Sequence, residues 1–173
     1  MPIHLPRAGM LKRWVLYPGL LLLVVIQFVP YGRSHDTALA RIEPAWDRGE
    51  TRTLFMQACG DCHSHETRWP WYSRIAPVSW LVQSDVGEGR KYFNVQEWGR
   101  STRNRGKDAA EALREGEMPP WYYTPLHAEA RLSSADRQRL IDGLAATFGG
   151  EHGAGPQAPT GGDDDHAAKA DRD

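Results

Sequence analysis

Five consecutive residues, Cys59-Gly60-Asp61-Cys62-His63, constrain this 173-residue chain more than any other stretch. Two cysteines separated by two residues and followed at once by a histidine form the pattern by which haem is attached covalently, with the imidazole as an iron ligand. Cysteines at positions i and i+3 of a helical turn lie on one face, so both sulfurs can reach one edge of a porphyrin. The motif therefore predicts one haem c, attached through Cys59 and Cys62, with His63 on the iron.

Three other kinds of site could use the same residues, and each fits the sequence less well. A structural zinc site needs four ligands, whereas the chain has only two cysteines, and His63 and His65 are too close together for a zinc-binding histidine pair. A thioredoxin-like pair needs a preceding buried strand, but residues 51–58 have a helical pattern. A disulfide across two intervening residues would be strained. Haem attachment therefore remains the favoured interpretation.

The N-terminal part of the chain has the pattern of a membrane segment. Arg7, Lys12 and Arg13 precede an uncharged apolar run from Trp14 to Val29, which predicts a transmembrane helix near the lower length limit for spanning a bilayer. The positive-inside rule then places the rest of the chain on the periplasmic side of a bacterial inner membrane. A cleavable signal peptide is the alternative, because Ala38-Leu39-Ala40 offers a cleavage site. That site lies well beyond the apolar run, which favours a retained anchor.

Composition divides the chain into four regions. We expect a membrane anchor over residues 1–31, a linker over 32–45, a haem-binding domain over 46–149 and a disordered tail, rich in Gly, Ala, Pro and Asp, over 150–173. The formal net charge is −1, so no basic excess indicates a nucleic-acid partner. Both cysteines belong to the motif, so no disulfide framework is available, and the fold must rely on its helices and on the haem.

Hydrophobic spacing predicts an all-α domain with a small cytochrome c-like fold. Helices are expected over residues 51–57, 77–92, 108–115 and 135–148. Ser133 or Ser134 would cap the last helix. Residues 100–107 have the composition of a solvated basic loop.

Apolar and aromatic side chains near the motif are candidates for packing against the haem. Leu54 and Phe55 lie just before Cys59, and a dense aromatic cluster follows the motif, from Trp69 to Tyr72. Such rings bury large apolar areas and leave an N–H or O–H group free to bond a propionate or a carbonyl. We therefore expect both groups at the haem.

Met118 is the candidate for the sixth iron ligand. It precedes Pro119 and Pro120, and because proline disfavours the α region for the residue before it, the thioether is presented from a stiff extended segment. Most methionines fill gaps in cores, but the position of Met118 in a rigid loop after the motif favours ligation. His65 is too near His63 to reach the opposite face of the haem and is expected at the surface. His127 is the one alternative ligand or distal catalytic residue, and it is also expected at the surface.

From about Trp46 to Phe148 the chain resembles the bacterial haem-binding domain family, membrane-anchored monohaem proteins related to cytochrome c. The likeness rests on separate blocks in the same order, at Cys59–Ser64, Trp69–Ser73, Ile75–Trp80, Glu88–Arg90 and Glu117–Tyr122. The chain departs from the family pattern at Val95 and Gln96, where an aromatic residue and a serine are usual. The resemblance implies covalent haem and electron transfer, and it identifies no redox partner.

Two classes of function follow from these residues. With His63 and Met118 as ligands, the iron offers no site for a substrate, and the protein carries single electrons at a potential that thioether ligation raises. If Met118 does not ligate, an open position would make the protein a gas or redox sensor or a peroxidase-like enzyme. No evident distal acid and base pair supports the second class. We therefore expect an electron carrier rather than an enzyme.

Overall fold

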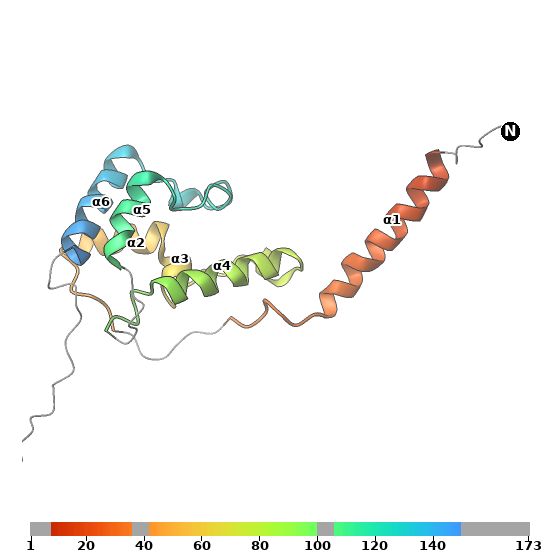
Figure 1. Cartoon of the computed structure of the whole chain (residues 1–173), viewed down its shortest axis with the longest axis horizontal. Coiled ribbons are helices and arrows are strands. Elements are labelled where there is room, and N and C mark those ends of the chain that lie inside the picture. Colours follow the sequence, from red (N-terminus) through yellow and green to blue (C-terminus); the bar gives the residue numbers. More distant parts are fainter. Residues whose placement is uncertain (1–7, 36–41, 100–105, 150–173) are drawn as a thin grey trace, which may run out of the picture.

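The computed structural model describes residues 8–35, 42–99 and 106–149, and within these ranges the chain is helical without a β-strand (Figure 1). This confirms the predicted all-α class. The α-helices are α1 (Ala8–Val25), α2 (Gly49–Ala58), α3 (Gly60–His63), α4 (Val78–Tyr92), α5 (Ala109–Glu115) and α6 (Ser134–Phe148). Short 3-10 helices occupy Ile26–Phe28, Trp71–Arg74, Gly106–Asp108 and Ala128–Ala130. The predicted tail over 150–173 and most of the predicted basic loop lie outside the described residues.

The four helices that the sequence predicted for the domain are confirmed to within two residues at each end. Pro77 immediately precedes α4, in agreement with the preference of proline for the start of a helix. The hydroxyl of Ser133 accepts a hydrogen bond of 3.0 Å from the backbone N–H of Asp136, so Ser133 is the cap of α6. Local signals in the sequence therefore fix these helix boundaries.

The predicted transmembrane helix over Trp14–Val29 is not supported. Helix α1 begins before this run, includes Lys12 and Arg13, and ends at Val25. Among the residues that the structure describes, no helix is both long and apolar enough to cross a membrane.

The core of the domain lies where α2, α5 and α6 meet the turn that follows α4 (Figure 1). Its buried side chains are Leu54, Phe55, Phe93, Val95, Trp98, Ala110, Leu113, Leu140, Ile141, Leu144 and Phe148. Trp46 packs on this cluster, with its ring centroid 5.4 Å from that of Phe55 and 5.8 Å from that of Phe148. The segment before α2 is thus fastened to both α2 and α6.

Helix α4 lies directly against the cysteine motif at Gly89. A Cβ atom at this position would lie 2.7 Å from the carbonyl oxygen of Cys62, closer than real Cβ contacts come. A glycine is therefore required where α4 touches α3. Glycines at positions 87 and 89 are compatible in sequence with the close approach of another backbone or with a loop, but only the structure shows that Gly89 meets Cys62 and that Gly87 meets nothing.

Candidate functional site

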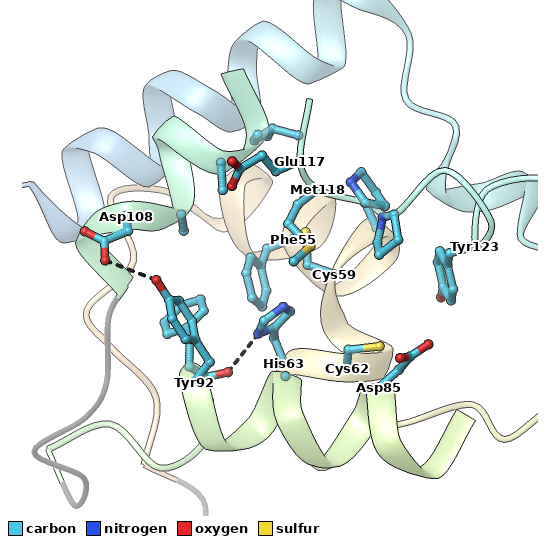
Figure 2. Close-up of a pocket in the computed structure, with 18 of the residues that line it drawn as sticks. Phe55, Cys59, Cys62, His63, Asp85, Tyr92, Asp108, Glu117, Met118 and Tyr123 are labelled. Carbon is cyan, nitrogen blue, oxygen red and sulfur yellow. Dashed lines mark hydrogen bonds between the residues drawn. The ribbon is translucent and has the colours of Figure 1, made fainter. Parts of the chain in front are cut away.

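Helix α3 holds the cysteine motif as a single helical turn that follows α2. The backbone N–H groups of Cys62 and His63 both donate to the carbonyl of Cys59, at 3.2 and 3.0 Å. These bonds fix the helical spacing that the motif predicts, with both cysteines and the histidine on one short turn. All three side chains line the same cavity (Figure 2).

The cavity has a volume of about 620 Å³, within the range of about 300–1,000 Å³ that is typical of ligand and cofactor sites. Every helix from α2 to α6, and the loop after α5, contributes to its wall (Figure 2). Its apolar wall includes Phe55, Ala58, Phe93, Leu113, Pro119, Pro120 and Leu144. Phe55 therefore lies where the sequence predicted, whereas Leu54 is buried in the core and does not line the cavity.

His63 points into the cavity with one ring nitrogen already engaged. Its Nδ1 lies 2.9 Å from the carbonyl oxygen of Phe93, so Nδ1–H donates and Nε2 keeps its lone pair (Figure 2). Burial lowers the pKa of His63, against smaller opposing effects of the Phe93 and Gly89 carbonyls. The ring is therefore neutral at pH 7, and a neutral imidazole oriented through Nδ1 is the form that binds metals.

A buried polar network holds the Phe93 carbonyl in place. The N–H of Val95 donates to the carbonyl of His63 at 3.0 Å. The fully buried amide of Gln96 accepts from the N–H of His65 at 2.9 Å, while the Gln96 N–H donates to the Asn94 side chain at 2.9 Å. These bonds tie the turn after α4 to the segment after α3. The sequence did not predict this support for His63, because its hydrogen-bond acceptor is a backbone carbonyl, a group that every residue has.

His65 lies in this network rather than at the surface, so its predicted exposure was wrong. Its Nε2 is 2.7 Å from Oε1 of Glu97 and 3.0 Å from Nδ2 of Asn94, and only 7% of the residue is exposed. Polar partners supplied by the turn after α4 compensate for its burial. His65 does not line the cavity.

Both cysteines are free thiols in the cavity wall. Burial raises the pKa of Cys59 and the pKa of Cys62 to about 12, and for Cys62 the carboxylates of Asp85 and Asp61 add to this effect. Both side chains are therefore protonated thiols at neutral pH.

The loop after α5 brings Met118 to the wall of the cavity across from His63 (Figure 2). Helix α5 ends at Glu115, and the next residue, Gly116, has a left-handed φ of 81°, a conformation that favours glycine. The next two N–H groups, of Glu117 and Met118, both donate to the carbonyl of Ala112, at 3.0 and 3.2 Å. The methionine thus leaves the helix along a defined path, although it remains 40% exposed.

The aromatic cluster after the motif does not pack at the cavity, contrary to the prediction. Trp71 is 76% exposed, and the ring of Trp69 instead stacks on His35 with the centroids 4.0 Å apart. No residue of the cluster, Trp69 to Tyr72, lines the cavity. The aromatic residues that line the cavity come from other elements and are Phe55, Tyr92, Phe93, Tyr122 and Tyr123.

His127 is half-buried and lies outside the cavity wall, rather than at the surface. Its Nδ1 lies 2.9 Å from the carbonyl oxygen of Tyr123, and its Nε2 lies 3.3 Å from the hydroxyl of Tyr72. Both ring nitrogens therefore have protein partners.

The wall and its donor groups fit a haem. The cavity is large and predominantly apolar, and it presents two thiols, one imidazole nitrogen with a free lone pair and one thioether. These are the groups that attach and ligate haem in proteins.

Comparison with known proteins identifies the same chemistry. A family model described as haem-binding domain matches residues 21–146. No curated protein and no solved structure matches the chain. Because the family model covers well over half of the sequence and includes every residue of the site, the chain belongs to the haem-binding domain family.

Proposed function

We propose that this haem protein is an electron carrier in which Cys59 and Cys62 attach one haem covalently and His63 and Met118 ligate the iron. One observation supports this most strongly. An imidazole nitrogen and a thioether face each other across the cavity that contains both cysteines (Figure 2). When bound, the haem would supply a one-electron iron couple.

The chain's own residues prepare both ligands. His63 is held through Nδ1 by the Phe93 carbonyl, and burial keeps its ring neutral, so little reorganisation is needed for Nε2 to bind. Met118 is held at its N–H by Ala112 and followed by two prolines, which limits the backbone freedom that ligation would cost.

A sensor or a peroxidase-like enzyme would need an open iron position with acid and base groups beside it. The two histidines that could serve, His65 and His127, lie outside the cavity wall, and each has side-chain or carbonyl partners. The donor set therefore favours a six-coordinate carrier. A periplasmic location and attachment to the inner membrane stay predictions from the sequence.

Ligation is tested by optical spectroscopy of the full-length haem protein. The oxidised protein should show the weak near-infrared band of thioether-to-ferric-haem ligation, and the reduced protein should bind carbon monoxide poorly. Met118→Ala should abolish the band, open the iron to carbon monoxide and lower the reduction potential. His127→Ala is the matched control and should leave the band unchanged.

Two results would overturn this assignment. A wild-type spectrum without the band, altered by His127→Ala, would make His127 the ligand and Met118 a packing residue. A reduced wild-type protein that binds carbon monoxide readily would favour the sensor or enzyme class.

Attachment is tested separately by denaturing electrophoresis with haem staining. Because each thiol should form a thioether, haem should migrate with the wild-type polypeptide, and replacement of Cys59 and Cys62 by alanine should release it. Haem that leaves the denatured wild-type protein would exclude covalent attachment without bearing on the ligands.

A further inference from the structure

The loop that carries Met118 continues to Tyr123, and its backbone hydrogen bonds in this stretch are short-range. The Tyr123 N–H donates to Pro120 at 3.0 Å, and the Leu126 N–H donates to Tyr123 at 3.2 Å. Such turns shape the loop, but they do not join it to the helix that carries His63. Side chains make that connection.

Tyr123 reaches the cysteine motif through its hydroxyl. The phenol O–H donates to Oδ2 of Asp61 at 2.7 Å, across 62 positions of sequence. Asp61 lies between the two cysteines, on the same turn as His63, and is 6% exposed. A hydrogen bond to a buried carboxylate is stronger than one between neutral groups.

The carboxylate of Asp61 is itself fixed from the other side. Its Oδ1 accepts from the N–H of Arg68 at 2.8 Å and from the guanidinium of Arg68 at 3.2 Å, and Oδ2 accepts from the guanidinium at 3.3 Å. Thr67 also donates to the Asp61 carbonyl at 2.6 Å. Asp61 is thus a rigid acceptor and not a mobile surface carboxylate.

The ring of Tyr123 is held as firmly as its hydroxyl. One face stacks on His127, with the centroids 3.7 Å apart and the planes 8° from parallel. Tyr123 also lines the cavity (Figure 2). The neighbouring Tyr122 lines the same cavity.

We propose that the hydrogen bond from Tyr123 to Asp61 is a latch that holds the Met118 loop against the cysteine motif and thereby keeps the thioether at the iron. This proposal rests on the proposed function, since it assumes that Met118 ligates. Tyr123 acts through the loop and is a positioning residue. Without its hydroxyl the loop should swing away more often, and Met118 should leave the iron more easily.

The test measures how readily imidazole replaces Met118 in the oxidised full-length haem protein. Tyr123→Phe keeps the ring and its stacking on His127 but removes the bond to Asp61. We expect the imidazole affinity, and the limiting rate of imidazole binding set by Met118 release, to rise by about tenfold or more, equivalent to about 1.4 kcal/mol. Asp61→Asn, which retains the shape of the side chain but weakens the acceptor, should act in the same direction.

Tyr72→Phe is the matched control, because it removes a phenol hydroxyl that contacts His127 but leaves the bond from Tyr123 to Asp61 intact. It should leave imidazole binding unchanged. If the Tyr123 hydroxyl only stabilised the fold, Tyr123→Phe would change the melting temperature without changing the limiting rate of imidazole binding.

The outcomes separate the latch from the proposed function. If the wild type shows the near-infrared thioether band and Tyr123→Phe binds imidazole as the wild type and Tyr72→Phe do, the latch is refuted and the ligation stands. If the wild type lacks the band, both proposals fail. If Tyr123→Phe does not fold, Asp61→Asn decides by the same measurement.

Discussion

Replacement of Gly89 by alanine should push α4 away from the cysteine motif. The added Cβ would lie 2.7 Å from the carbonyl oxygen and 3.0 Å from the Cβ of Cys62, where ordinary contacts begin at 3.4 Å. Neither neighbour is the free end of a flexible side chain, so relief requires one helix to move by several tenths of an ångström. Because α3 also carries His63, the strain falls on the site itself.

The cost of overpacking at position 89 can be separated from the intrinsic helix propensity of alanine. Overpacking of this kind costs about 1–3 kcal/mol, while alanine in place of glycine within a helix contributes about 0.5–1 kcal/mol of stability. Gly87 lies on the same helix with no atom within 4 Å of where a Cβ would lie, so Gly87→Ala gains the helix propensity of alanine without overpacking. The two variants should therefore differ in unfolding free energy by about 1–3 kcal/mol.

Thermal and denaturant unfolding of the haem-loaded variants, followed by far-ultraviolet circular dichroism, measure this difference. Gly87→Ala should melt at or above the wild-type temperature and Gly89→Ala well below it, with about 4–8 °C for each kcal/mol in a domain of this size. Equal melting temperatures for the two variants would refute the close approach of α4 to Cys62.

Three further outcomes are expected. Glu43 accepts hydrogen bonds from Arg52, which lower the pKa of Glu43 from 4.5 to about 2. The ionised Glu43 therefore stabilises the fold fully above pH 4.5, and this contribution is lost as the pH falls toward 2. Glu43→Gln should flatten the pH dependence of the urea midpoint in that window. Gln96→Ala leaves the buried N–H of His65 without its acceptor and should cost about 1–3 kcal/mol in urea unfolding, whereas an unchanged midpoint would contradict the network. Ser133→Ala removes the cap of α6 and should cost about 1 kcal/mol by the same assay, with Ser133→Asp retaining stability.

The sequence predicted the features of this domain that depend on near neighbours. Helix boundaries follow from Pro77, Ser133 and the apolar spacing between them, which are all local signals. The cysteines and His63 share one helical turn, so their convergence on a single cavity was encoded in five residues. Met118 lies in the same wall, as its setting before two prolines suggested.

What the sequence did not reveal depends on contacts between distant segments. The partner of His63 is a backbone carbonyl 30 positions away, and the partner of Asp61 is a tyrosine 62 positions away. His65 was assigned to the surface because it lies too close to His63 to reach the opposite face of the haem, but its burial depends on the Asn94 and Glu97 side chains, which only the fold brings to it. The predicted transmembrane helix is not supported for a different reason, since the apolar run in the sequence does not show that α1 ends at Val25.

Several residues serve the hydrophobic core and the cavity at once. Phe55, Phe93, Leu113 and Leu144 belong both to the buried cluster and to the cavity wall. A haem in the cavity would therefore contact side chains that also hold the helices together, and the free energy of its binding is thermodynamically linked to that of folding. We expect the haem-loaded protein to resist unfolding more than the haem-free chain.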